Sequence, residues 1–77
     1  MNAKDLEGKD IIDAEGNKVG EVDGIEIDTN KNTVVGIIAN DASISAKLGM
    51  GESRIIPVDK IQALGEKVLL KRMERQM

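Results

Sequence analysis

Side chains that could carry out covalent chemistry are few in this sequence, and they lack a partner of the required kind. Three serines, Ser43, Ser45 and Ser53, lie in the second half of the chain, and a serine nucleophile needs a neighbouring base. The sequence contains no histidine, the usual general base, and no cysteine. Lys47 is close to the serines, but its segment has the composition of a loop, so no Ser–Lys pair is expected. The sequence predicts no catalytic residue and no enzyme activity.

Acidic side chains form the second group that could do chemistry, because clustered carboxylates bind hard cations such as Ca²⁺. Four of them recur along one short segment, at Glu21, Asp23, Glu26 and Asp28. We interpret these four as the solvated face of a strand. Residues 28–32 begin like a calcium-binding loop, but Thr33 stands where that loop needs glycine and Ala39 where it needs glutamate. A hairpin turn explains the Asx residues, so we expect no bound metal and no other cofactor.

The bulk composition limits the kind of partner. A chain of 77 residues suffices for one domain, which buries only ~60% of the surface of its unfolded chain and is therefore marginally stable. Because disulfides are excluded, we expect a homodimer to supply further stability. Residues 1–28 hold nine acidic and three basic side chains, whereas residues 29–77 hold five and eight. Phe, Tyr and Trp are absent, so no side chain can stack on bases, and nucleic acid is not the expected partner.

We expect no targeting signal in this sequence. The first seven residues are polar and do not resemble the apolar core of a signal peptide. No stretch approaches the ~20 apolar residues that span a bilayer. We therefore expect a cytoplasmic protein that does not insert into a membrane.

Glycine and Asx residues divide the chain into short apolar segments, which is the pattern of a small β-barrel. We expect strands over residues 6–13, 18–28, 33–39, 54–58 and 66–71. Asp41 is expected to cap a short helical turn, and Asp59 to begin another over residues 60–63. Pro57 lacks an N–H group, which places its strand at an edge or a bend.

The segment over residues 18–28 predicts one long strand that bends twice. Its apolar residues are Val19, Val22, Ile25 and Ile27. Side chains of a flat strand alternate between two faces, but this series changes parity twice. Gly20 lies inside the first change and Gly24 inside the second, and glycine within a strand commonly marks a bulge. Such bends are what a strand needs to wrap around a tight barrel.

A few apolar residues outside the expected strands are candidates for protein-binding or dimer contacts. They are Ile44, Leu48, Met50, Met73 and Met77. Methionine is frequent at adaptable contact surfaces, and exposed apolar patches mark interfaces. The alternative is that these side chains close the open ends of the barrel.

The order and spacing of these segments resemble the PRC-barrel domain family over nearly the whole chain. Residues 3–12 carry a leucine and a glycine before the first strand, and residues 16–22 carry a G-x-x-V-G-x-V core. Residues 55–61 contain the I-P-x-x-x-I segment that is common in the second half of the domain. The resemblance implies an all-β fold, a small PRC-type barrel of about six strongly bent, mainly antiparallel strands with one short helical turn. We expect it to span residues 1–71, followed by a polar tail over 72–77.

The same resemblance implies binding and no shared catalytic residues. Many archaea carry free-standing short PRC-barrels, which this chain resembles most, and some of these are adaptors linked to the cell-division ring. We therefore expect a non-catalytic protein-binding adaptor, with a division or cell-organisation complex as the partner class. The alternative is a ribosome-assembly or RNA-processing accessory, similar to the C-terminal domain of the ribosome maturation factor RimM. That role would use Arg72 and Arg75 to contact RNA or a ribosomal protein.

Overall fold

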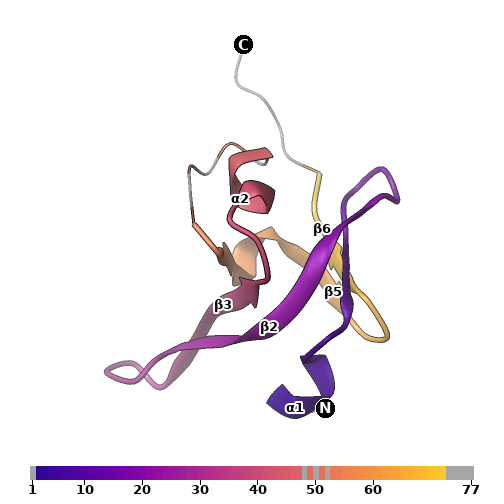
Figure 1. Cartoon of the computed structure of the whole chain (residues 1–77). Helices are drawn as coiled ribbons and strands as arrows, with labels where there is room; N and C mark the ends of the chain where they lie inside the picture. The colour runs from indigo at the N-terminus through magenta and orange to yellow at the C-terminus, as the bar shows by residue number, and fades with distance from the viewer. Residues whose placement is uncertain (1, 48, 50, 52, 73–77) are drawn as a thin grey trace.

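The computed structural model of the protein describes residues 2–47, 49, 51 and 53–72, without the side chain of Lys47. Along the chain its elements are α1 (Ala3–Leu6), β1 (Asp10–Ile12), β2 (Lys18–Asp28), β3 (Thr33–Ala39), α2 (Ser43–Lys47), β4 (Ile55–Pro57), the 3-10 turn η1 (Val58–Lys60), β5 (Ile61–Leu64) and β6 (Val68–Leu70). Figure 1 shows the strands curving around one another, with α2 beside one end of the barrel and α1 beside the other.

The six strands form one sheet in the order β4-β3-β2-β1-β6-β5. Four neighbouring pairs are antiparallel, and β1 with β6 is the single parallel pair. Within the part of the chain that the structure describes, β4 and β5 are the two ends of this order and are joined only through η1. The prediction of a small barrel of about six mainly antiparallel strands is confirmed, and Pro57 lies at an edge, as expected.

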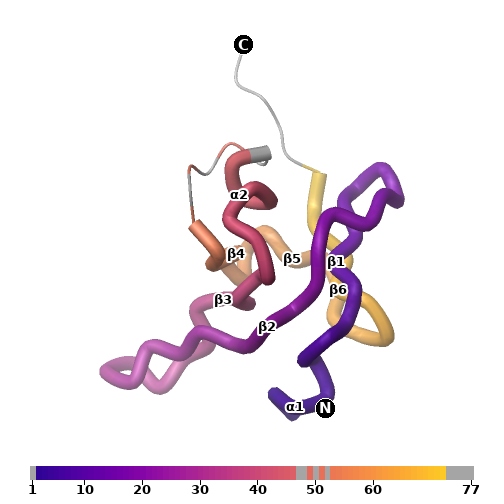
Figure 2. The backbone as a smooth tube through the Cα atoms, viewed as in Figure 1, coloured from indigo at the N-terminus to yellow at the C-terminus, as the bar shows by residue number. Residues whose placement is uncertain are grey.

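The long strand β2 bends at both expected places. Its register with β1 shifts so that Val19 is an extra residue beside Gly20. Its register with β3 shifts between Val22 and Gly24, so that Asp23 is the second extra residue. Because each bulge increases the local twist, β2 can belong to both halves of the barrel. Beyond the second bulge, β2 and β3 continue together as a hairpin that extends away from the barrel (Figures 1 and 2).

At Gly20 and Gly36, neighbouring atoms lie so close to the backbone that the Cβ atom of any other residue would overlap them. A Cβ atom on Gly20 would overlap the end of the Ile44 side chain, which α2 inserts against β2. A Cβ atom on Gly36 would overlap the backbone carbonyl of Ile56 in the neighbouring strand β4. The core that results is aliphatic, and its buried residues are Leu6, Ile11, Val22, Ile37, Ala39, Ile44, Ile56, Val68 and Leu70.

The helical segments differ from the expectations. The N-terminal turn α1 was not predicted, and it is capped by reciprocal hydrogen bonds between Asn2 and Asp5. The expected helical turn over residues 60–63 is wrong, because Ile61–Leu64 pairs with β6 as strand β5. The turn η1 lies earlier, and Asp59 is inside it rather than at its N-cap. Asp41 does cap the turn before α2, since its Oδ1 accepts a hydrogen bond from the Ser43 N–H at 2.8 Å.

Among the described residues, no helix has the length and apolar character needed to cross a bilayer.

Candidate functional site

An apolar groove of about 400 Å³ lies between the N-terminal turn and the β2–β3 hairpin on one side and η1 and β5 on the other. We call this feature the apolar groove, and its lining residues are Asn2, Ala3, Leu6, Ile25, Ile27, Val34, Gly36, Ile37, Val58, Ile61 and Leu64. The residues at its base belong to or pack against the core, whereas those at its rim reach solvent. The groove is therefore an outward extension of the aliphatic core.

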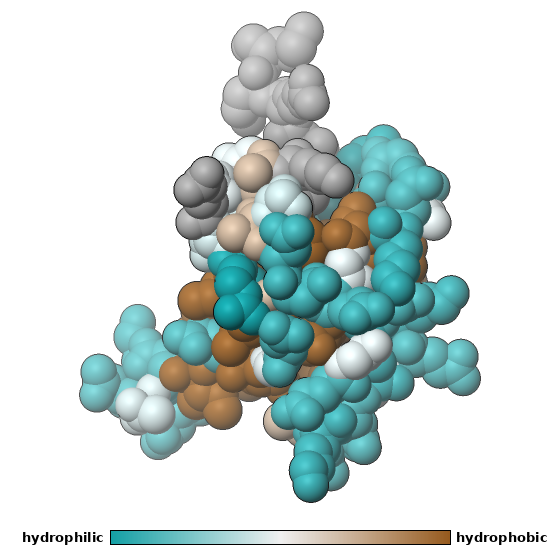
Figure 3. All heavy atoms as spheres, in the orientation of Figure 1, coloured by the Kyte–Doolittle hydropathy of each residue, from teal (hydrophilic) through white to brown (hydrophobic). Residues whose placement is uncertain are grey.

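Four aliphatic side chains at the rim of the groove are about half exposed. Ile27 is 54% exposed and Val34 50%, and both come from the hairpin. Val58 of η1 is 49% exposed and Leu64 of β5 is 45% exposed. Figure 3 shows hydrophobic atoms gathered along the β2–β3 hairpin as it leaves the barrel. These exposed apolar side chains come from three separate elements, and exposed apolar patches are candidates for contact surfaces.

The local structure explains why these side chains face outward. Ile27 and Val34 are register partners beyond the last shift between β2 and β3, where the hairpin has left the barrel. Pro57 ends β4 with an extended backbone, and η1 then turns Val58 away from the core. Leu64 is the last residue of the edge strand β5. Each exposed residue thus lies where an element ends or departs from the barrel.

The polarity of the groove indicates what kind of molecule fits it. Small-molecule sites combine apolar walls with a few polar groups that orient the ligand. Among the described residues that line the groove, Asn2 alone has a polar side chain, and its Oδ1 already accepts the Asp5 N–H at 3.2 Å. The groove therefore presents almost no hydrogen-bonding group, which suits the apolar side chains of a protein better than a polar metabolite.

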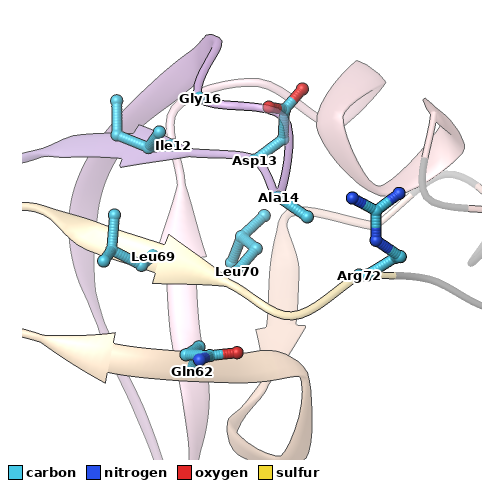
Figure 4. Close-up of a pocket in the computed structure, with 8 residues that line it drawn as sticks. All are labelled: Ile12, Asp13, Ala14, Gly16, Gln62, Leu69, Leu70 and Arg72. Atoms are coloured by element: carbon cyan, nitrogen blue, oxygen red, sulfur yellow. The ribbon is translucent and has the colours of Figure 1, made fainter.

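A second hollow of about 430 Å³ lies on the other half of the sheet, next to the turn that joins β1 and β2. Figure 4 shows Ile12, Leu69 and Gln62 side by side on the adjacent strands β1, β6 and β5. Its charged groups are already engaged. The Oδ1 atom of Asp13 accepts backbone N–H groups of the turn at 2.8 and 3.0 Å, and the Arg72 guanidinium lies 3.4 Å from Glu15. We call this hollow the polar pocket. Its two charged side chains have partners in the turn, and the exposed side chain of Gln62 also lines it.

A comparison with sequence models of protein families shows to which family the chain belongs. A sequence model of the PRC-barrel domain matches residues 1–77, the whole chain. The chain is a PRC-barrel domain. No curated protein matches it. The family match agrees with the six-stranded, strongly bent sheet described above and confirms the resemblance found in the sequence.

The structure of this PRC-barrel places one of the predicted contact residues in the core. Ile44 is only 1% exposed and packs through α2 against Gly20 of β2. The surface interpretation of Ile44 is therefore wrong, and the side chain closes one end of the barrel. The other four candidates, Leu48, Met50, Met73 and Met77, lie outside the described residues.

The residues of the apolar groove were not singled out from the sequence as a surface. Ile27 and Val34 belong to segments whose apolar residues all read as barrel core, and nothing local shows where the barrel ends. The sequence does contain one indication that Ile27 and Val34 are exposed, which is the polar turn at residues 29–32. Strand residues next to a hairpin turn are commonly solvated. The exposure of Val58 and Leu64 follows from the positions of η1 and β5 in the fold. Those positions depend on contacts between residues that are distant in sequence.

The acidic residues of β2 have defined structural partners in the PRC-barrel. Asp23 pairs with the Arg54 guanidinium, whose Nε also donates to the Ala39 carbonyl oxygen. Glu21 lies 3.0 Å from the Lys18 ammonium. The hydrogen bond to Glu21, followed by that to Asp10 at 3.2 Å, raises the pKa of Lys18. Within the described residues, no three potential metal-binding side chains come together.

The turn at the end of the hairpin is held by one carboxylate. The Oδ1 atom of Asp28 accepts the Asn30 N–H at 2.9 Å and the Lys31 N–H at 3.3 Å. Asn32 has a φ of 53°, a left-handed conformation that asparagine tolerates. The Asx turn expected for this segment is thus present, and it fixes the end of the strands that carry Ile27 and Val34.

The serines have structural surroundings of their own. Ser45 is fully buried in α2, and its Oγ makes no hydrogen bond with any described residue. The Oγ atom of Ser53 accepts the backbone N–H of Ile55 at 3.1 Å, at the start of β4. Neither oxygen is presented in the apolar groove or in the polar pocket.

Proposed function

We propose that this PRC-barrel domain is a non-catalytic adaptor that binds other proteins, and that the apolar groove is its binding surface. The observation that carries the proposal is the set of half-exposed aliphatic side chains, Ile27, Val34, Val58 and Leu64, around one groove with almost no polar lining. A marginally stable domain of this size gains nothing from exposing such side chains unless a partner covers them.

The partner class we propose is a division or cell-organisation complex in the cytoplasm. Support for this class comes from the free-standing PRC-barrels that the sequence resembles. An RNA partner is less well supported, because Arg72 already faces Glu15 at 3.4 Å and the chain has no aromatic side chain to stack on bases. Arg75 lies outside the described residues.

The test is a tagged pull-down from native extract, divided into nuclease-treated and untreated halves and read by mass spectrometry. We expect division-ring or membrane-scaffold proteins to survive the nuclease, because a groove of aliphatic side chains binds protein. Ribosomal proteins or RNA that disappear after nuclease treatment would contradict the proposal and favour the ribosome-assembly alternative.

A matched pair of variants ties the captured proteins to the groove. Val58→Glu places a charge at the rim of the groove, and Leu69→Glu places the same charge at a residue of similar exposure, 40%, in the polar pocket. Captured proteins should be lost with Val58→Glu and retained with Leu69→Glu. Equal capture by both variants would show that the groove is not the binding surface.

A further inference from the structure

We propose that α2 is a conformational switch, which detaches from the barrel while the six-stranded sheet stays folded. Ile44 holds the helix closed by filling the space over Gly20, and the unpaired hydroxyl group of Ser45 favours its release. The inference goes beyond the proposed function, because α2 lies beside one end of the barrel and α1, which borders the apolar groove, beside the other (Figure 1). The switch therefore changes one end of the adaptor without altering its binding surface.

One aliphatic side chain attaches α2 to the barrel. Among the described side chains of this helix, those of Ile44 and Ser45 are buried, whereas those of Ser43 and Ala46 are exposed. The helix has five residues, and helices this short are not stable without the packing of a buried face. Ile44 supplies the large apolar group of that face, with its Cδ1 atom against Gly20. The closed position of α2 therefore depends on a single isoleucine.

The other buried side chain of α2 opposes the closed position. Ser45 is 0% exposed, and its Oγ makes no hydrogen bond with any described residue. A buried hydroxyl group without a partner has lost its hydrogen bonds to water, and it recovers them when it returns to solvent. Detachment of α2 returns Ser45 to solvent. The two buried side chains of the helix thus act in opposite directions, which is the property of a switch.

The backbone within α2 is held by long hydrogen bonds. The Ile44 N–H donates to the Asp41 carbonyl oxygen at 3.4 Å, and the Ala46 N–H donates to the Ala42 carbonyl oxygen at 3.3 Å. Hydrogen bonds of this type usually measure about 2.9–3.0 Å, and longer ones are weaker. Little backbone hydrogen bonding is therefore lost when the helix leaves the barrel.

The chain on both sides of α2 is fixed to the sheet. Before the helix, Asn40 and Glu21 share two hydrogen bonds of 2.9 Å, one to the Asn40 Oδ1 and one from the Asn40 N–H. After the helix, the Arg54 carbonyl oxygen accepts the Ala39 N–H at 2.6 Å, and the Arg54 Nε donates to the Ala39 carbonyl oxygen at 2.8 Å. The Arg54 guanidinium also pairs with Asp23. Because these contacts lie outside α2, the strands keep their pairing when the helix detaches.

The first experiment measures how often a buried position of α2 becomes accessible in the full chain. The sequence has no cysteine, so Ser45→Cys introduces a single thiol that a thiol reagent reaches only when α2 detaches. Ala39→Cys in β3 and Val68→Cys in β6 place the thiol at equally buried positions of the sheet. We expect Ser45→Cys to react at least about tenfold faster than either. Its rate should change little in dilute urea, because detachment exposes little surface.

The second experiment tests the part played by the unpaired hydroxyl group. Ser45→Ala removes it, and the Ala46 N–H should then exchange with solvent about tenfold more slowly, as measured by NMR. Ser43→Ala is the matched control, because it makes the same change in helix propensity at an exposed residue of the same helix. It should slow the exchange by less than about threefold.

Two outcomes would overturn the inference. The first is a Ser45→Cys thiol that reacts no faster than complete unfolding of that variant allows, with the urea dependence of the two sheet positions. The second is equal slowing of the Ala46 exchange by Ser43→Ala and Ser45→Ala, which would leave helix propensity as the whole cause. The proposed function is judged separately, because the pull-down variants Val58→Glu and Leu69→Glu do not change α2.

Discussion

Ile27 and Val34 lie opposite each other across the β2–β3 hairpin, and each leaves about half of its side chain in solvent. Two steps earlier along β2, Ile25 faces Ile37 in the same way, but there the pair packs on the core. A shift in the strand register between Glu26 and Ile27 separates the two pairs, and only the pair beyond it is exposed. The same strand pairing thus makes core at one end and exposed apolar surface at the other.

Replacing the exposed valine should therefore have little effect on stability. Val34→Thr keeps the β-branched shape and should change the free energy of unfolding by no more than about 0.5 kcal/mol when measured on dilute protein. Val22→Thr makes the same change at a side chain that is 2% exposed, and burying its hydroxyl should cost about 1–3 kcal/mol. Urea unfolding followed by far-UV circular dichroism measures both. Equal costs would mean that the Val34 side chain is buried in the monomer.

Replacing Gly20 by alanine should cost less stability when Ile44 is shortened, although Asn40 Oδ1, 2.8 Å from the added Cβ, must still shift. Gly20→Ala places a methyl group where the end of the Ile44 side chain lies, and overpacking of this kind costs about 1–3 kcal/mol. Ile44→Val removes the nearest atom, Cδ1, so the double variant should lose less stability than the two single effects added together. Thermal unfolding of the four proteins gives the coupling.

Gly24→Ala is the control for that series. A Cβ atom on Gly24 would meet the Ile38 side chain at 3.7 Å, which is an ordinary contact. The variant should therefore be close to the wild type in melting temperature. A loss as large as that from Gly20→Ala would show that strand conformation, rather than crowding against α2, sets the requirement for glycine.

The carboxylate of Asp28 should stabilise the hairpin without any metal. Asp28→Ala removes both hydrogen bonds to the turn, each worth about 0.5–1.5 kcal/mol, while Asp28→Asn keeps an accepting oxygen and should retain most of the stability. Melting temperatures in the presence of EDTA and of millimolar Ca²⁺ should be the same for all three proteins. A rise with Ca²⁺ that is confined to the wild type would contradict this account of the turn.

Lys18 should contribute stability that disappears at high pH. Its pKa is raised in the folded protein, first by the hydrogen bond to Glu21 and then by Asp10, so the folded state holds the proton more tightly than the unfolded state. The contribution is complete below the ordinary lysine value of 10.5 and is lost as the pH rises through the folded value. The melting temperature of the wild type should exceed that of Lys18→Gln near neutral pH, and the difference should vanish at the alkaline end. A constant difference would rule out an ionic origin.

Sequence reasoning was most successful where a local pattern reflects a local cause. The two parity changes in residues 18–28 each enclose a glycine, and the structure has a bulge beside each one. The continuous apolar run over residues 33–39 became β3 with the expected bounds. The burial expected of a central strand holds only for its second half, because residues 33–35 are exposed. Pro57 indicated an edge strand for the simple reason that it cannot donate a hydrogen bond.

The features that the sequence did not predict all depend on contacts between residues that are distant in the chain. Residues 61–64 have no strong local preference, and they form β5 because β6 is available to pair with them. Ile44 is buried because Gly20, more than twenty positions earlier, leaves room for it. The apolar groove is a further case. Val58 and Leu64 line it together with the hairpin because η1 connects the edge strands β4 and β5. Periodicity shows which residues are apolar, and only the complete fold shows which of them remain uncovered.

The parallel pairing of β1 with β6 has a consequence for how this domain acquires its structure. Ile11 pairs with Val68 and Ile12 with Leu69, so contacts that join β1 to the rest of that half of the barrel span nearly 60 positions of the chain. Closing such a long loop is slow compared with forming a hairpin. During synthesis, β2 can pair early with β1 and β3, whereas the pairing of β1 with β6 must wait until residues 68–70 have left the ribosome. The hairpin that carries the exposed Ile27–Val34 pair would then be able to meet another chain before β6 completes the barrel.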